Sequence, residues 1–396
     1  MRSETNFIYV IVKPLVIAFD GKRAANNKTG LGNYSRHIIS LLAKYFPENR
    51  YVVFLPKANK NKQLDDILTA NENVSEVFPK KGLWQKFSSL WRSYGIKSDI
   101  INLHSTIYHG LSNELPQTIK KTNVKSVVTI HDLIFLKFPK FYKFFDRKIY
   151  TYKFRTACQN ADRIIAVSEC TKRDIVDVFK INPDKIDVIY QGCDKVFKTD
   201  IAPETLLEVK KKYNLPDRFL LNVGSIEERK NAMLIVKALP LLKTQLPLVI
   251  VGKRTKYTAE VEKTAESLGV SNLLHIFDKV PFEDLASFYH LAEVFIYPSR
   301  YEGFGIPIIE AINCGVPVVA ATGSCLEEAG GPDCQYVDPD NAKSLAQAIE
   351  RVLNTPENQD FRANAIAKSS EYVKRFSEDN QAIQLMDCYK KILNGK

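Results

Sequence analysis

The fold class of this chain is decided by one stretch, Pro298-Ser299-Arg300-Tyr301-Glu302-Gly303-Phe304-Gly305-Ile306-Pro307-Ile308-Ile309-Glu310. An apolar segment at 292–297 precedes it, and a second apolar run at 316–320 follows it. The order of strand, glycine-containing loop, short helix and strand predicts a parallel βαβ unit. Pro307 suits the first turn of the helix, and Gly315 suits its C-terminal cap.

The loop of this unit predicts an anion-binding site. Gly303 and Gly305 free backbone N–H groups at the N-terminus of the helix. The carboxylates of Glu302 and Glu310 flank the same loop. Backbone donors suit phosphates and carboxylates suit hydroxyls, so this segment suits a ligand that carries both groups.

Short apolar runs alternate with polar or amphipathic stretches along the whole chain. The runs that we expect to be strands lie at 14–20, 51–55, 100–103, 126–130 and 163–167, and again at 219–224, 246–252 and 274–277. This rhythm predicts an α/β protein in which two doubly wound, Rossmann-like domains face a cleft. A length of 396 residues agrees with two domains, each with its own core.

We expect the domain boundary near residue 198, within a charged segment. Residues 1–197 would form the first domain, and residues 198–377 the second. The remainder, 378–396, begins with an amphipathic segment that predicts a helix from about Glu378 to Leu393. We expect this C-terminal helix to pack back on the first domain.

The charge of the chain is unevenly distributed. The net charge is +11, but residues 1–197 hold 32 Lys and Arg against 18 Asp and Glu, and the remainder holds 24 against 27. The basic half indicates an anionic partner, either a nucleic acid or a membrane surface. Charge alone leaves both alternatives open.

The composition argues against several other classes. The chain has 45% hydrophobic and 26% charged residues, and none of its apolar runs approaches the roughly 20 residues of a membrane-spanning helix. A short apolar run at 7–12 is interrupted by Lys13-Pro14, so we expect an intracellular, cytoplasmic protein without a leader. The seven cysteines form no Cys-x-x-Cys pair and the six histidines have no metal-ligand spacing, so we expect neither a disulfide framework nor a metal site.

Three further segments of the chain hold candidates for chemistry. His131 ends the expected strand at 126–130, at the carboxyl edge where α/β proteins bind ligands. Arg229 and Lys230 follow the strand at 219–224, where adjacent cations can pair with a diphosphate. Gly32 opens the first long helix and would allow close approach to a phosphate or sugar. Each has a structural alternative as well: a buried histidine, a solvated helix start and an ordinary tight turn.

A basic and aromatic stretch, Lys137-Phe138-Pro139-Lys140-Phe141-Tyr142-Lys143-Phe144-Phe145-Asp146-Arg147-Lys148, lies in the first half. A similar stretch is found at 80–87. Such segments can lie on an anionic bilayer. The alternative is that the aromatic rings belong to the core and the lysines to a solvated face.

Taken together, the motifs resemble those of the retaining family-4 glycosyltransferases of the GT-B fold, especially bacterial mannosyltransferase-like members. The resemblance covers most of the chain and is strongest from Gly224 to Asp340. The segments that carry it are Thr29-Gly30-Leu31-Gly32-Asn33-Tyr34, His131-Asp132-Leu133, Val167-Ser168-Glu169, Val188-Ile189-Tyr190-Gln191-Gly192-Cys193-Asp194, Val223-Gly224, Glu228-Arg229-Lys230-Asn231, Tyr297-Pro298-Ser299, Glu302-Gly303-Phe304-Gly305 with Glu310, and Val337-Asp338-Pro339. Their order and spacing are specific even though no single segment is.

The resemblance implies a role for each candidate residue. His131 and Glu302 would be the catalytic residues, close to the transferred sugar, and Glu310 would bind the ribose hydroxyls. The diphosphate and base contacts would come from the remaining positions, which are Gly32, Arg229, Lys230, Val280, Gly303, Phe304 and Gly305. Many members have an arginine directly after the glycine of the Val-Gly strand end, where this chain has Ser225, so the phosphate contacts are expected at Arg229 and Lys230.

The resemblance also implies the reaction. The expected enzyme is a metal-independent, retaining hexosyltransferase that moves mannose from a nucleotide sugar, with GDP-mannose as the expected donor. The acceptor would be lipid-linked or a polysaccharide such as lipopolysaccharide, and the basic first domain would touch an anionic membrane. No further cofactor is expected. The alternatives are a GT-B relative of different chemistry, such as a sugar-nucleotide epimerase or a phosphorylase, and a basic nucleic-acid-binding protein, for which no recognisable motif is found.

Overall fold

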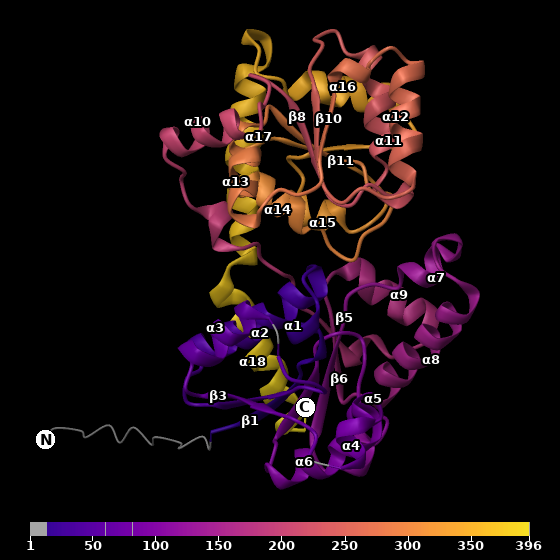
Figure 1. The fold of residues 1–396 in the computed structure, drawn as a ribbon, viewed down its shortest axis with the longest axis vertical. Coiled ribbons are helices and arrows are strands. Elements are labelled where there is room, and N and C mark those ends of the chain that lie inside the picture. The colour runs from indigo at the N-terminus through magenta and orange to yellow at the C-terminus, as the bar shows by residue number, and fades with distance from the viewer. Residues whose placement is uncertain (1–13, 60, 81, 396) are drawn as a thin grey trace, which may run out of the picture.

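The computed structural model describes residues 14–59, 61–80 and 82–395, and the segment at 7–12 lies outside them. Two α/β domains follow one another along the long axis of the molecule (Figure 1). Each domain is built on a parallel sheet with helices on both faces. The predicted fold class is therefore confirmed.

The first sheet has seven strands among the described residues, in the order β3-β2-β1-β4-β5-β6-β7. Apolar runs form these strands because both faces of a parallel sheet are covered. Their bounds are β1 (Val16–Asp20), β2 (Arg50–Phe54), β3 (Val74–Val77), β4 (Ile107–Gly110), β5 (Lys125–Ile130), β6 (Arg163–Ala166) and β7 (Ile186–Val188). Strand β1 pairs with a neighbour on each side: its Ile17 lies opposite Tyr51 of β2 and opposite Ile107 of β4.

Helices cover both faces of the first sheet. One face carries α1 (Lys22–Asn26), α2 (Gly30–Tyr45), α3 (Lys62–Ala70) and α18 (Glu378–Leu393). The other face carries α6 (Ile96–Asn102), α7 (Ile134–Lys137), α8 (Phe144–Asn160) and α9 (Glu169–Phe179), with α4 (Leu83–Lys86), α5 (Ser88–Leu90) and the π-helical turn η1 (Trp91–Gly95) beside them.

The second sheet has the order β10-β9-β8-β11-β12-β13. Its strands are β8 (Leu220–Val223), β9 (Leu248–Val251), β10 (Leu274–Phe277), β11 (Val294–Tyr297), β12 (Val318–Ala321) and β13 (Gln335–Val337). One face packs on α10 (Pro203–Lys212), α13 (Phe282–Leu291), α14 (Ile306–Asn313), α15 (Leu326–Gly330) and α17 (Gln359–Val373). The other face packs on α11 (Ala232–Ala238), α12 (Tyr257–Ser267) and α16 (Ala342–Val352).

Single 3-10 turns connect several of these elements, at Ile119–Lys121, Pro139–Phe141, Pro183–Lys185, Lys195–Lys198, Glu228–Lys230, Leu239–Leu241, Ser271–Leu273, Pro356–Asn358 and Lys374–Phe376. The turn at Lys195–Lys198 joins the two domains in sequence. Its Phe197 already packs edge-on against Tyr289 of the second domain, with ring centroids 5.5 Å apart.

The C-terminal helix returns to the first domain, as predicted. Figure 1 shows α17 beside the second sheet and α18 beside the first, so the end of the chain runs along both domains. Leu385, Met386 and Tyr389 of α18 are buried in the core of the first domain. Nε2 of His37 on α2 lies 2.8 Å from Oε1 of Gln381, which adds a polar contact at the same interface.

One expected strand is wrong. Residues 100–102 are the end of helix α6 and Leu103 is its C-cap, and the next strand, β4, begins only at Ile107. Ile100 is fully buried whereas Ile101 is 42% exposed, which is the pattern of an amphipathic helix end. A short apolar run does not distinguish a strand from a buried helical turn.

Candidate active site

The candidate site lies at the carboxyl edge of the second sheet, where the strand order reverses. β8 is central, with β9 on one side and β11 on the other. The loop after β8 carries Arg229 and Lys230, and the loop after β11 carries Glu302, so both open at this switch point. Doubly wound sheets bind ligands at this position.

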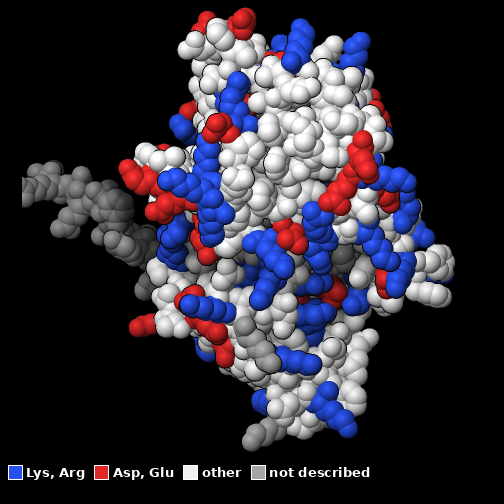
Figure 2. All heavy atoms as spheres, turned by 45° about the horizontal axis from the view of Figure 1, so that its top comes forward, with Lys and Arg blue, Asp and Glu red and all other residues white. Residues whose placement is uncertain are grey.

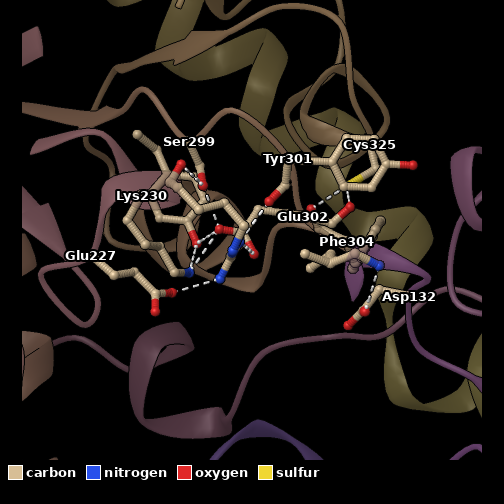
Figure 3. Close-up of polar contacts among 12 residues, drawn as sticks. Asp132, Glu227, Lys230, Ser299, Tyr301, Glu302, Phe304 and Cys325 are labelled. Carbon is tan, nitrogen blue, oxygen red and sulfur yellow. Dashed lines mark hydrogen bonds and ion pairs between the residues drawn. The ribbon is translucent and has the colours of Figure 1, made fainter. Parts of the chain in front are cut away.

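Glu302 lies in a nearly buried cluster of charged side chains (Figure 3). Its carboxylate oxygens lie 2.8 Å from Nη1 of Arg229 and 2.8 Å from Nζ of Lys230. The Ser299 hydroxyl donates to Oε1 at 2.5 Å. Burial raises the pKa of Glu302, but Lys230 and Arg229 outweigh burial and lower the pKa to about 2. Glu302 is therefore an ionised carboxylate in a fixed orientation.

Arg229 and Lys230 are used differently. Arg229 also pairs with Glu227 at 2.8 Å and donates to the Tyr301 carbonyl at 2.5 Å, so both its terminal nitrogens have acceptors. Lys230 donates to the Tyr297 hydroxyl at 2.7 Å as well as to Glu302. Since an ammonium has three N–H donors, Lys230 keeps one that has no acceptor among the described residues.

The glycine-containing loop presents backbone donors beside this cluster. The N–H groups of Phe304 and Gly305 have no protein acceptor within the described part of the chain. Gly305 is the N-cap of α14, so these donors stand at a helix N-terminus. Gly303 is required by close packing, because a Cβ atom there would lie 2.1 Å from the carbonyl oxygen of His131.

Glu310 lies on α14, after the loop. Its Oε2 accepts a hydrogen bond from the buried hydroxyl of Tyr289, at 2.7 Å. Burial raises the pKa of Glu310 to about 7, against the lowering effect of Tyr289. Asp194 adds a smaller upward shift, and Lys230 a smaller downward one. Glu310 thus titrates near neutral pH, unlike Glu302.

His131 faces this loop from the end of β5 in the first domain. Its backbone N–H donates to Asn113 at 2.8 Å, and its Nε2 lies 2.9 Å from the carbonyl oxygen of Leu111. A carbonyl only accepts, so Nε2 carries the proton and Nδ1 presents a lone pair. Burial lowers the pKa of His131 to about 4, which keeps the ring neutral at pH 7.

Two predicted residues, Gly32 and Val280, make no direct contact with the charged cluster among the described residues. Gly32 lies in the first turn of α2, where a Cβ atom would approach the Asn27 carbonyl oxygen to 1.9 Å. Its N–H donates to the Thr29 carbonyl at 2.9 Å, so the structure gives this glycine a role within its own turn. Val280 lies between β10 and α13, at the carboxyl edge that also carries the loop after β9. Ligand contacts of both residues stay predictions.

The two domains touch at the site. The Ser168 hydroxyl donates to the Gly303 carbonyl at 2.7 Å. The carboxylate of Glu328 accepts hydrogen bonds from the N–H groups of Glu169 and Cys170, at 2.7 and 2.8 Å, and so caps α9 from the other domain. On the face shown in Figure 2, Lys and Arg side chains gather across the middle of the molecule, where the domains meet. The loop after β11 is therefore held from both sides.

Sequence reasoning missed several residues that support the site. Tyr289 binds Glu310 from α13, and Asn113 binds the backbone of His131 from a loop after β4. Neither residue belongs to a motif, and they lie 21 and 18 positions from their partners in the sequence. Ser168 stands in a recognised segment, but nothing in that segment indicates a contact with the other domain.

The fold and the site define a two-domain enzyme of the GT-B class. The family model described as "Glycosyl transferases group 1" matches residues 205–369, and the one described as "Glycosyltransferase Family 4" matches residues 30–196. The O-antigen chain mannosyltransferase B of Escherichia coli is 30% identical over 91% of this chain and 96% of its own length. The chain belongs to the family-4 glycosyltransferases, and the prediction of a glycosyltransferase is confirmed.

Other relatives agree with this assignment. The O-antigen chain mannosyltransferase RfbU of Salmonella typhimurium is 26% identical over 64% of this chain and 66% of its own length. A glycosyltransferase from Rickettsia africae, of known crystal structure, superposes with a TM-score of 0.74 at 21% identity, covering 97% of this chain and all of that one. Anabaena HepE, solved with UDP and glucose, superposes with a TM-score of 0.72 at 16% identity over 95% of this chain and all of that one. The two structures show the fold alone.

Proposed function

We propose that this glycosyltransferase moves a mannosyl group from GDP-mannose to a growing surface polysaccharide, with retention of configuration. The observation that carries the proposal is the cluster after β8 and β11. It combines an N–H of Lys230 and loop amides that have no acceptor among the described residues with two carboxylates, of which Glu302 has a lowered pKa and Glu310 a raised one. The choice of mannose is supported by two relatives, which are both named O-antigen chain mannosyltransferases.

The donor would bind across the switch point of the second sheet. Its diphosphate would accept hydrogen bonds from Lys230 and from the amides of Phe304 and Gly305, which are in place before the donor arrives. Preorganised donors of this kind stabilise charge that develops on a leaving group. Glu310 would accept hydrogen bonds from the ribose hydroxyls while Tyr289 holds its other oxygen.

The acceptor hydroxyl would then attack the sugar from the same face as that from which the phosphate leaves. The bond between the sugar C1 and the phosphate oxygen breaks, and a bond between C1 and the acceptor oxygen forms. The acceptor proton passes to the phosphate oxygen that has just left. Glu302 suits electrostatic support of the cationic sugar better than covalent attack, because Lys230 and Arg229 engage both its oxygens.

The acceptor would approach with the first domain on an anionic bilayer. On α8, Phe145, Ile149 and Tyr152 are 76%, 52% and 64% exposed, and their spacing places them on one stripe. Lys148 lies beside the stripe and is exposed as well. Figure 1 shows α4 and α5 on the same side of the domain as α8, and Trp84 and Phe87 are also exposed there.

These exposures favour the membrane interpretation of the aromatic stretch over the core interpretation. Exposed aromatic residues that alternate with basic residues on a helix are typical of segments that lie in a bilayer interface. Within the described residues, no helix combines the length and the apolar character that crossing a bilayer requires. We therefore propose peripheral contact, on the cytoplasmic face of the membrane.

A donor panel tests the proposed reaction. Thermal unfolding would be followed with GDP-mannose, UDP-glucose and other nucleotide sugars, since a ligand at 100 times its Kd adds about 2.7 kcal/mol to the stability of the folded state. GDP-mannose should give the largest shift, and Lys230→Ala and Glu310→Ala should reduce both the shift and mannosyl transfer. Turnover without an acceptor would indicate an epimerase, and full activity of both variants would show that the site is elsewhere.

Vesicle sedimentation tests the membrane contact. The wild type should bind vesicles containing phosphatidylglycerol more than pure phosphatidylcholine vesicles, and Phe145→Glu with Ile149→Glu should abolish the difference. Leu207→Glu on α10 is a matched control, because Leu207 is 55% exposed but lies in the second domain. Equal binding of the wild type and the double variant would refute the contact.

A further inference from the structure

A line of buried polar side chains crosses the first domain from the C-terminal helix to the site. On α18, the Tyr389 hydroxyl lies 2.7 Å from Nδ1 of His109 on β4. Nε2 of His109 lies 2.8 Å from Oγ1 of Thr129 on β5, and this oxygen lies 3.1 Å from the hydroxyl of Tyr34 on α2. Tyr389, His109 and Thr129 are fully buried and Tyr34 is 4% exposed.

The line ends against the candidate catalytic histidine. The rings of Tyr34 and His131 pack edge to face, with centroids 4.6 Å apart and an interplanar angle of 90°. This is a favoured geometry for aromatic pairs. One edge of the His131 ring is bonded to the Leu111 carbonyl, so the contact with Tyr34 restricts the remaining rotation of the imidazole.

The protons of the line can be assigned. Tyr389 makes no other hydrogen bond among the described residues, so its O–H donates to Nδ1 of His109. Burial, together with His131, lowers the pKa of His109 to about 3, and the ring is neutral. Nε2 of His109 therefore carries the proton and donates to Thr129. The donors are thus defined from Tyr389 to Thr129, and between Thr129 and Tyr34 either hydroxyl can donate.

We propose that Tyr389, His109 and Thr129 are positioning residues, which set the orientation of His131 through the ring of Tyr34. The inference rests on the proposed function for the role of His131, but its geometry does not depend on the identity of the donor. In this proposal, α18 also contributes a positioning residue to the site, in addition to covering the first sheet. In the sequence, α18 follows α17, which packs on the second domain. The residues that support His131 therefore include one, Tyr389, from the segment that returns from the second domain to the first.

The position of the line supports a role beyond stability. Hydrogen-bonded polar groups in a core are often no more stabilising than apolar groups of the same shape, but they specify one arrangement. Here the hydrogen bonds of the line specify the orientation of the Tyr34 ring, which packs on His131. Another fully buried tyrosine of this core, Tyr51, donates to the Leu42 carbonyl at 2.8 Å, and its hydrogen bonds involve no residue of the line among the described residues.

The test compares Tyr389→Phe with Tyr51→Phe in the full-length chain. Each variant loses one buried hydroxyl, so both should lose similar stability. Tyr389→Phe alone should lower kcat about fivefold with little change in the donor KM, and it should shift the imidazole NMR resonances of His131. Those resonances are assigned with a His131→Asn variant and are measured without any substrate.

Thr129→Val and Thr129→Ser give a second comparison. Valine removes the hydroxyl that joins His109 to Tyr34 and should reproduce the effects of Tyr389→Phe, whereas serine keeps the hydroxyl and should restore wild-type values. Unchanged His131 resonances and unchanged kcat in both Tyr389→Phe and Thr129→Val would overturn the inference. A wild-type protein that transfers no sugar would refute the proposed function instead. The His131 resonances would still test whether the hydrogen-bonded line orients this ring.

Discussion

Replacing Glu302 by glutamine tests the charged cluster most directly. The substitution keeps the shape of the side chain and removes its charge. Arg229 and Lys230 would stay nearly buried without the carboxylate that both now contact at 2.8 Å. Glutamine can still accept hydrogen bonds, so the expected loss comes from the ion pairs.

The magnitude follows from the shift in pKa. The pKa of Glu302 falls from its ordinary value of 4.5 to about 2, and each pKa unit corresponds to about 1.36 kcal/mol, so its ionisation contributes about 3 kcal/mol to the free energy of unfolding at pH 7. Only 12% of the side chain is exposed, which limits screening by solvent. Because the folded-state pKa is depressed, this contribution is complete above about pH 4.5 and is lost as the pH falls toward 2.

Urea unfolding and transfer kinetics provide the assay. Glu302→Gln should lose about 3 kcal/mol at pH 7, and its deficit relative to the wild type should narrow between about pH 5 and pH 3. It should also lower kcat strongly, because Glu302 would lie beside the reacting sugar.

Glu293→Gln is the matched control. Glu293 is 9% exposed and pairs with Arg218 at 3.2 Å, but it lies at the amino end of β11, away from the site. This variant should lose stability and keep kcat. Wild-type stability of Glu302→Gln at pH 7 would refute the account of the ion pairs, and wild-type kcat would refute the placement of Glu302.

Two further predictions concern the neighbouring residues. Burial raises the pKa of Glu310 to about 7, so donor affinity measured by calorimetry should fall as the pH drops from about 8 to 6. Glu310→Gln should remove that dependence. A donor affinity of the wild type that does not change with pH would contradict the ribose contact. Gly303→Ala would place a Cβ atom 2.1 Å from the His131 carbonyl oxygen, so it should separate the domains, with a larger radius of gyration in X-ray scattering and at least tenfold lower kcat.

Local patterns were sufficient for the main elements of the fold. Strands β8, β9, β11 and β12 are short apolar runs because helices cover both faces of the sheet, and each is visible in the sequence. Pro307 and Gly315 mark the ends of α14, as expected: the proline stands in its first turn, and Gly315 has a φ of +72°. The run at 100–103 failed because its two adjacent isoleucines, of which Ile100 is buried and Ile101 is exposed, fit a helix end as well as a strand in the sequence pattern.

The candidate site could be predicted only in part. Its motif residues are adjacent in sequence, and backbone N–H groups at a helix start bind anions whatever surrounds them. The pairing of Arg229 with Glu302 joins residues more than 70 positions apart, and its geometry depends on β8 lying next to β11. The opposite pKa shifts of Glu302 and Glu310 have the same origin, since packing sets both the cations beside Glu302 and the burial of Glu310.

By itself, the sequence determined a chain of two parallel α/β domains with an anion-binding loop after a buried strand, because periodicity and turn residues act over a few positions. Only the tertiary structure decided which side chains share a site. It placed the Gly303 loop against His131, exposed the aromatic stripe of α8 and connected Tyr389 to the site through His109. These contacts join distant parts of the chain, and their geometry is set by the order of the strands and by the helix that returns from the second domain.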